Sequence, residues 1–421
     1  MKLVVAFLFT LMYNNSKLLL EVFRLTIEEI KKLDQTYYMN TFGERIPLCF
    51  DHGEGIRLFD CSGREYYDFF AGIAVNALGY GNREFTDSLC SYLQNHLPHT
   101  SNLYYVETQA KLAERLVQCS CADRVFFANS GAEANEGAVK LARIYQYKKN
   151  RPQKNKIITL INSFHGRTMA TVAATGQEKY QKPYRPLTPG FVHIPINDID
   201  ALKRELDGTV CAVMVEPIQG ESGVYPLEDG FAKTLRKLCS DDDILLIFDE
   251  VQTGIGRTGK LFAYEHFGIE PDIFTLAKAL GNGIPVGAVC AKNEVAKAFS
   301  PGDHGSTFGG NGFACQAGLT VLSIIEKEKL VQNAAEVGGY FKENLQKIQS
   351  PLIQQVRGVG LMIGIELQDG KAKAAQQALL ERGFVTGCVG EKILRLLPPL
   401  ILQKSEADLF TECFESVLKL L

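Results

Sequence analysis

Residues 244–254 read ILLIFDEVQTG, an apolar run that ends in two adjacent carboxylates. Five apolar residues bounded by a polar cluster are typical of a short buried β-strand, here Ile244–Phe248. The same pattern occurs at Arg124–Ala128, Lys156–Ile161 and Cys211–Val215. Because longer helical patterns lie between these runs, the sequence predicts an α/β fold with a mostly parallel sheet.

Each of the four predicted strands is followed by a polar cluster. In chain order the clusters read NSGAE, NSFHGR, EPIQGE and DEVQTG. Ligands of open parallel sheets bind beyond the carboxyl ends of the strands. The sequence therefore predicts that the four clusters line one shared site.

A chain of 421 residues exceeds the usual size of a single hydrophobic core. From Leu319 the pattern changes to a long amphipathic stretch that ends at Ile348, followed by strand-like and helical segments. We therefore expect a large domain over 76–318 and a smaller α/β C-terminal domain over 319–421. The segment 26–75 is expected to pack with the small domain or on a partner subunit.

The composition narrows the class of protein. Apolar residues make up 46% and charged residues 22%, which is typical of a globular chain, and the net charge of −3 is too small to attract nucleic acid or anionic lipid. The eleven cysteines include no CxxC pair, so we expect buried thiols, no metal site and a cytoplasmic location. A metal held by the CxC pair Cys119 and Cys121 is the weaker alternative.

The first residues resemble the start of a secretory signal, because Lys2 precedes the apolar run Leu3–Tyr13. The run lacks a small-residue cleavage site and is shorter than the roughly 20 residues that cross a bilayer. We expect an apolar N-terminal extension over 1–25 and no membrane association.

Lys278 is the candidate catalytic residue. It follows a short apolar strand, precedes a glycine turn and has only uncharged neighbours in FTLAKALGNG. A desolvated lysine has a lowered pKa and becomes a nucleophile. An ordinary surface lysine on a helix is the alternative.

Asp249 directly follows the strand ILLIF and is next to Glu250. A carboxylate at a buried strand end needs a cationic partner, and a protonated pyridine nitrogen is one. The alternative, a magnesium site, would require a GxxxxGK[ST] phosphate loop, which the sequence lacks.

Two further clusters could hold the rest of such a ligand. Ser130 and Glu133 have capping-box spacing, so the amides of Gly131 and Ala132 would open a helix and could bind a phosphate. Phe164 offers an aromatic face, and Arg167 offers a guanidinium that can grip a carboxylate. His165, between them, is interpreted as a packing or supporting residue.

Taken in order, NSGAEANEGAVKLAR, SFHGRT, EPIQGE, DEVQTGIGRTG, FTLAKALGNG and HGSTFGGN resemble the class III pyridoxal-phosphate (PLP) aminotransferases. The resemblance runs from about Thr26 to the C-terminus and implies a fold type I PLP-dependent transferase. Within the family, Asn40–Glu44 and the run FAGIAVNALGYGN are most similar to the members that act on acetylornithine.

The resemblance implies a role for individual residues. Lys278 matches the lysine that carries PLP as a Schiff base and moves the proton, and Asp249 matches the partner of the ring nitrogen. The other expected cofactor contacts are Gly131, Ala132, Phe164, Glu250, Val251, Gln252 and Thr307. Thr307 would reach the phosphate of a partner chain, and Ser306 would contact the substrate there, so a homodimer is expected.

The expected substrates are an amine donor and 2-oxoglutarate. Arg395 matches the arginine that takes the α-carboxylate of the oxo acid, Glu221 matches the acid that neutralises it for the donor, and Arg167 would hold the distal carboxylate. Ornithine-specific relatives tend to carry a tyrosine where this chain has Gly72, so the expected donor is N2-acetyl-L-ornithine. Tyr80 departs from an expected histidine.

Other donors stay open. They are ornithine, succinylornithine, succinyl-diaminopimelate and 4-aminobutyrate. From other classes, a PLP aminomutase or racemase would keep Lys278 and Asp249 but need not keep Glu221 and Arg395, and a non-catalytic binding protein would be free to lose Lys278.

Overall fold

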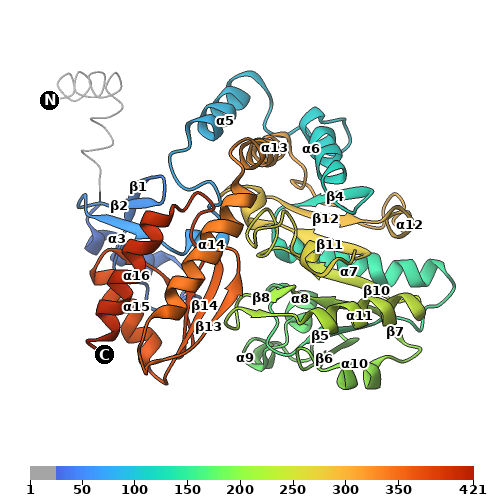
Figure 1. Ribbon diagram of the computed structural model, residues 1–421. Helices are drawn as coiled ribbons and strands as arrows, with labels where there is room; N and C mark the ends of the chain where they lie inside the picture. Colours follow the sequence, from blue (N-terminus) through green and yellow to red (C-terminus); the bar gives the residue numbers. More distant parts are fainter. Residues whose placement is uncertain (1–24) are drawn as a thin grey trace. The chain divides into compact units, whose positions relative to one another are not determined.

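The computed structural model describes residues 25–421 (Figure 1). The chain divides into two compact units. The described part of the first consists of residues 25–51 and 59–64, and the second consists of His52–Leu58 and Glu65–Leu421. The predicted extension over 1–25 lies, except for its last residue, outside the described residues.

The first unit contains helix α3, Ile27–Tyr37. Thr26 caps it, because the Thr26 hydroxyl accepts from the Glu29 amide and the Glu29 carboxylate accepts from the Thr26 amide. The strands β1 (Phe50–Glu54) and β2 (Arg57–Asp60) contain residues of both units.

A seven-stranded sheet is the centre of the second unit. Its order is β4-β12-β11-β10-β7-β5-β6. The bounds are β4 Arg124–Ala128, β5 Lys156–Leu160, β6 Phe191–Ile194, β7 Val210–Val215, β10 Leu245–Asp249, β11 Ile273–Leu276 and β12 Gly287–Ala291. Only β12 runs antiparallel to its neighbours, which confirms the mostly parallel sheet. All four predicted strands are present within one residue of their expected bounds.

Alternate residues of the central strands enter two different cores. Leu245 and Ile247 of β10 pack with the small residues of helix α7 (Gly131–Lys148), whereas Leu246 and Phe248 join the larger core on the opposite face. This follows from the period of two along a strand. Because both faces are covered, these strands are continuously apolar, which is the pattern that revealed them in the sequence.

The helices of this region have the following bounds. They are α5 Arg83–Asn95, α6 Glu107–Gln118, α7 Gly131–Lys148, α8 Met169–Ala174, α9 Glu178–Gln181, α10 Ile199–Glu205, α11 Asp229–Asp241, α12 Asn293–Ala296 and α13 Gly312–Lys327. In Figure 1, α5, α6 and α13 gather beside β4, the edge strand of the sheet. The second unit also contains short elements outside the seven-stranded sheet. They are β3 Glu65–Asp68, α4 Ala71–Ala74, β8 Ile218–Gln219 and β9 Tyr225–Pro226.

The C-terminal residues form a second, four-stranded sheet of order β13-β14-β17-β16. The bounds are α14 Leu330–Lys347, β13 Ile353–Val359, β14 Met362–Leu367, α15 Lys371–Glu381, β15 Phe384–Val385, β16 Gly387–Val389, β17 Ile393–Leu396 and α16 Lys404–Leu418. The three helices lie together beside the sheet (Figure 1). The smaller α/β C-terminal layer is therefore present.

The amphipathic stretch 319–348 is two helices rather than one. Lys329 has a φ of 54°, which separates α13 from α14. Helix α13 begins before Leu319 and packs against α5 and α6. The predicted boundary at residue 319 thus falls inside a helix, and the division into domains stays a prediction. No helix among residues 25–421 is long and apolar enough to span a bilayer.

An aromatic cluster fills the C-terminal layer. The ring of Phe410 lies 4.5 Å from that of Phe69, 5.5 Å from Phe341 and 5.6 Å from Phe384, centroid to centroid. Phe410 is fully buried.

We predict that Phe410→Ala lowers the free energy of unfolding by about 3–5 kcal/mol, because it leaves a cavity among the rings of Phe69, Phe341 and Phe384. Urea denaturation followed by circular dichroism measures this. Tyr147→Ala, at a side chain that is 66% exposed, is the control and should change the free energy by no more than about 0.5 kcal/mol. Equal effects of the two substitutions would contradict this account of the core.

Candidate active site

The carboxyl ends of β4, β5, β7 and β10 open into one cavity of about 410 Å³. Residues from all four predicted polar clusters line it. They include Asn129, Ser130, Gly131, Ala132, Phe164, His165, Arg167, Glu216, Glu221, Asp249, Val251 and Gln252, and Lys278 joins them from the end of β11. The structure thus brings together the clusters that the sequence assigns to one site.

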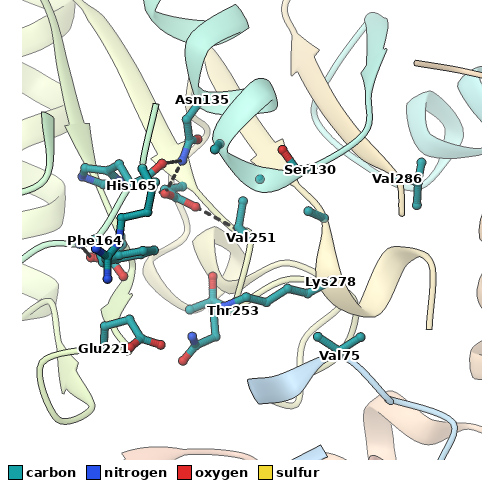
Figure 2. Close-up of a pocket in the computed structure, with 18 of the residues that line it drawn as sticks. Val75, Ser130, Asn135, Phe164, His165, Glu221, Val251, Thr253, Lys278 and Val286 are labelled. Atoms are coloured by element: carbon teal, nitrogen blue, oxygen red, sulfur yellow. Dashed lines mark hydrogen bonds and ion pairs between the residues drawn. The ribbon is translucent and has the colours of Figure 1, made fainter. Parts of the chain in front are cut away.

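Asp249, the last residue of β10, is 3% exposed and held from three directions. Its Oδ2 accepts from the Asn135 amide nitrogen at 2.7 Å and lies 2.8 Å from Nδ1 of His165. Its Oδ1 accepts from the Val251 amide at 3.1 Å. Figure 2 shows these contacts beside Val251. The carboxylate cannot rotate without losing a buried hydrogen bond.

Asn135 is a site residue that sequence reasoning missed. Its amide nitrogen also donates to the His165 carbonyl at 2.8 Å, and its oxygen accepts from the Thr275 hydroxyl at 2.7 Å. Asn135 stands inside the motif NSGAEANEG, but the motif does not show that its side chain points toward Asp249. His165, expected as a supporting residue, does contact Asp249.

Burial works against a charge on His165, but the contact with Asp249 and the nearby Glu216 raise the pKa of its imidazole. Glu216 at the end of β7 was also missed, although it begins the quoted EPIQGE. Its carboxylate accepts from the amides of Phe164 and Gly220, and burial followed by the charge of Asp249 raises its pKa.

Lys278 lies in an unusual backbone conformation, with φ at 44° two residues after the end of β11. A left-handed φ costs a non-glycine residue roughly 1–2 kcal/mol, so the surrounding turn fixes the direction of this side chain. Burial lowers the pKa of the Lys278 amine to about 8, against the opposing charges of Glu221 and Asp249. In Figure 2 the side chain points toward Thr253.

Glu221 and Arg395 form a partly buried ion pair beside the cavity. Nη1 of Arg395 donates to Glu221 Oε1 and to the Gly220 carbonyl, both at 2.9 Å. Burial alone would raise the pKa of Glu221, but Arg395 and Lys278 outweigh it and hold this pKa below its ordinary value. Nε of Arg395 and Oε1 of Gln252 are buried without a hydrogen-bond partner among the described residues.

Helix α7 presents its N-terminus to the cavity. Ser130 caps it by accepting from the Glu133 amide at 3.2 Å, so the amides of Gly131 and Ala132 are left for a ligand. A Cβ on Gly131 would lie 2.7 Å from Val251 Cγ1. Glycine is therefore required where the helix start meets Val251, and the helix terminus favours an anion.

Three comparisons place the chain among known proteins. The family model for class III aminotransferases matches residues 38–418. The chain belongs to the class III aminotransferase family. The acetylornithine aminotransferase of Methanocaldococcus jannaschii is 46% identical over 91% of this chain and 96% of its own length, and that of Gloeobacter violaceus is 49% identical over 90% and 95%.

Solved structures agree. The acetylornithine aminotransferase of Elizabethkingia anophelis has a TM-score of 0.84 at 34% identity, covering 94% of this chain and 100% of its own. The ornithine aminotransferase of Toxoplasma gondii, whose structure shows partial occupancy of PLP at the active site, has a TM-score of 0.91 at 32% identity over 96% and 97%. The fold is that of these class III enzymes.

Four residues expected in this class III site do not line its cavity. Arg395 lies beside it, paired with Glu221, and the other three are Glu250, Ser306 and Thr307. Glu250 is turned away, and its carboxylate accepts from the Thr253 hydroxyl and from the amides of Ala263 and Tyr264. Burial raises its pKa to about 7. The Ser306 hydroxyl accepts from Asn129 at 3.2 Å, and Thr307 is exposed. The prediction that Glu250 contacts the cofactor has no support in this geometry.

The segment around Gly72 is a left-handed turn. Ala71, Gly72, Ile73 and Ala74 have φ values of 47°, 62°, 69° and 60°. Tyr80 does not line the cavity, and its hydroxyl donates to Oδ2 of Asp68 at 2.6 Å. The departure at Tyr80 is therefore accommodated by a hydrogen bond inside the fold.

We predict that Asn135→Ala lowers the free energy of unfolding by about 1–3 kcal/mol, because Asp249 and Thr275 lose a buried partner. Chemical denaturation measures this. Asn95→Ala is the control: the Asn95 amide donates to the Ser91 carbonyl at an exposed position, and a change within about 0.5 kcal/mol is expected. A wild-type stability for Asn135→Ala would show that the network does not hold Asp249.

Proposed function

We propose that the chain is a PLP-dependent aminotransferase that moves the terminal amino group of N2-acetyl-L-ornithine to 2-oxoglutarate. The products would be N-acetyl-L-glutamate 5-semialdehyde and L-glutamate, a step of arginine biosynthesis. The observation that carries the choice of donor is the 45–49% identity to curated acetylornithine aminotransferases over 88–91% of the chain.

The cavity residues fit PLP. The fixed Asp249 carboxylate would pair with the pyridine nitrogen, and the side-chain amide of Gln252 would donate a hydrogen bond to the ring hydroxyl. The amides of Gly131 and Ala132 would hold the phosphate, with Phe164 and Val251 against the ring. Lys278 would attach covalently. When bound, PLP acts as an electron sink for the carbon that bears the amine.

Lys278 would also move the proton. A lysine with a pKa of about 8 is partly neutral near physiological pH, so it can accept a proton and return it. Its position between Glu221 and Asp249 keeps the protonated form accessible as well.

Arg395 and Glu221 would form a charge switch. With the amine donor bound, the observed ion pair neutralises Arg395, because the reacting carbon of that donor carries no carboxylate. For 2-oxoglutarate, Glu221 would withdraw and Arg395 would bind the α-carboxylate in its place. Arg167 would hold the distal carboxylate of either substrate.

We also propose that the enzyme is a homodimer in which Ser306 and Thr307 complete the site of the partner chain. The Asn102 side chain donates to the carbonyls of Ser306 and Gly309, so the two loops are tied together. Exposed apolar side chains cluster on them, namely Leu103, Tyr104, Tyr105 and Phe308. Exposed apolar patches mark interfaces.

All eleven cysteines are free thiols, which supports the proposal that the enzyme works in the reducing cytoplasm.

Ornithine is the second candidate donor, because ornithine aminotransferases are among the similar structures, with TM-scores up to 0.91. Gly72 itself does not line the cavity, whereas Val75 from the same turn does. The preference for an acylated donor therefore rests on the relatives more than on Gly72.

The test is a coupled assay of the purified, PLP-loaded protein with acetylornithine, ornithine, succinylornithine, succinyl-diaminopimelate and 4-aminobutyrate. We expect acetylornithine to have the highest kcat/KM, by roughly tenfold over ornithine, or about 1.4 kcal/mol in the transition state. If ornithine had the higher kcat/KM, ornithine would be the donor in place of acetylornithine. Turnover without 2-oxoglutarate would instead favour an aminomutase or racemase.

We predict that Glu221→Ala slows the half-reaction with acetylornithine by roughly tenfold and strengthens glutamate binding, because Arg395 is no longer neutralised. Single-turnover kinetics of each half-reaction measure this. Glu228→Ala, which removes an exposed carboxylate seven positions later, is the matched control and should change neither rate. Equal slowing of both half-reactions would contradict the switch.

We predict that covalent attachment of PLP to the cofactor-free protein accelerates with pH and levels off above about 8. Only the neutral amine reacts, and the lowered pKa of Lys278 means that deprotonation is complete at lower pH than for an ordinary lysine of pKa about 10.4. Attachment rates over a pH series measure this. A rate still rising steeply above pH 10 would contradict the lowered pKa.

A further inference from the structure

Both arginines of the proposed substrate site lie over aromatic rings to which the sequence motifs assign no role. Of these, Phe70 is the first residue of the run FAGIAVNALGYGN. The guanidinium carbon of Arg395 is 5.3 Å from the centroid of Phe70. That of Arg167 is 3.7 Å from the centroid of Tyr180. The two rings come from different elements, since Phe70 follows β3 and Tyr180 belongs to α9.

Phe70 is held by a hydrogen bond of its amide and by the backbone contact of its ring. Its amide donates to Asp68 Oδ1 at 2.8 Å, and Asp68 is itself held by the Tyr80 hydroxyl. A Cβ on Gly387 would lie 2.2 Å from the Phe70 ring, so the ring rests on the Gly387 backbone. Because Gly387 pairs with Arg395 across β16 and β17, the ring meets Arg395 in a fixed place.

Tyr180 connects Arg167 to the aromatic wall of the cavity. Its ring meets that of Phe164 edge to face, at 6.0 Å between centroids and 79° between planes. The Lys179 ammonium also lies 4.6 Å from the Tyr180 centroid. Arg167 is exposed, and its guanidinium makes no hydrogen bond within residues 25–421. Its ring contacts are Tyr180, at 3.7 Å, and Phe164, at 5.5 Å, so Tyr180 is the nearer of the two.

A guanidinium that stacks on a ring keeps its N–H groups free at the edge of its plane. A carboxylate binds at this edge, in a bidentate fork. The stack also removes rotations that a free arginine would lose on binding, which improves affinity without a new contact to the substrate. For Arg395, Nε is still without a partner among the described residues, while Nη1 donates to Glu221.

We propose that Phe70 and Tyr180 are positioning residues that preset Arg395 and Arg167 for the two carboxylates of the substrates. This inference rests on the proposed transamination. The two rings are expected to affect the binding of different substrates. Phe70 acts only on the step in which Arg395 binds an α-carboxylate at the reacting carbon, whereas Tyr180 acts on both substrates, because each has a distal carboxylate for Arg167.

The experiment compares Phe70→Leu and Tyr180→Leu with wild type in the two-substrate assay. Phe70→Leu should raise KM for 2-oxoglutarate by roughly tenfold and leave KM for acetylornithine within about twofold. Tyr180→Leu should raise both KM values, each by about three- to tenfold. The rescue variants Phe70→Tyr and Tyr180→Phe keep the ring and should restore the lost affinity. Equal changes in both KM values for Phe70→Leu, or leucine variants that match wild type, would overturn the proposal.

Phe191→Leu is the matched control. Arg143 lies 5.2 Å from the centroid of Phe191 at an edge strand outside the cavity, so the same kind of stack is removed with no substrate nearby. It should leave both KM values unchanged. A rise in KM for 2-oxoglutarate as large as that of Phe70→Leu would overturn the proposal, since loss of an arginine–ring contact far from the substrates would then have the same effect.

A binding measurement separates this inference from the proposed function. Calorimetric titration with glutarate, a five-carbon dicarboxylate, needs no turnover and no particular donor. Both leucine variants should bind glutarate roughly tenfold more weakly than wild type. If wild type binds glutarate but does not transaminate acetylornithine, the proposed function fails while the positioning role stands. If the variants bind glutarate as wild type does, the positioning role fails.

Discussion

The buried carboxylate of Asp249 is the interaction on which the rest of the site depends. Removing a carboxylate from water is costly unless hydrogen bonds and opposite charge compensate it. Here the donors come from helix α7, from the loop after β5 and from the residue that follows β10 by two, through Asn135, His165 and Val251. The Asp249 side chain therefore holds three segments of the chain together at the carboxyl edge of the sheet. A cationic ring nitrogen would further compensate its buried negative charge.

Charge balance sets the rest of the cavity. Burial and the charge of Arg395 lower the pKa of the Lys278 amine, whereas the charges of Glu221, Asp249 and Glu216 raise it. Burial outweighs them, and the pKa falls to about 8. Three carboxylates and two cations in one small volume are stable only as a set, since each loses its partner if one is removed. The same balance allows the Glu221–Arg395 pair to open when an anionic substrate replaces Glu221, because Arg395 exchanges one carboxylate for another.

The sequence predicted what depends on local pattern. The strands at Arg124–Ala128 and around Cys211 are apolar because both sheet faces are covered, and strand ends that share an edge meet in one cavity. It missed Asn135 and Glu216, because a polar residue inside a motif gives no sign of its direction. Phe70 and Tyr180 were missed because aromatic residues usually belong to the core. Glu250 was expected as a cofactor contact from the family resemblance, but successive residues at a strand end point to opposite sides, and its carboxylate accepts from the Ala263 amide instead.

The most direct test of the account is to find which lysine binds PLP. The PLP-loaded protein is reduced with borohydride, digested and analysed by mass spectrometry, with Lys278→Ala treated in parallel. The account predicts that the cofactor mass is found on the peptide that contains Lys278, and that Lys278→Ala carries no PLP and has no turnover. Cofactor on another lysine, or full activity of Lys278→Ala, would contradict it.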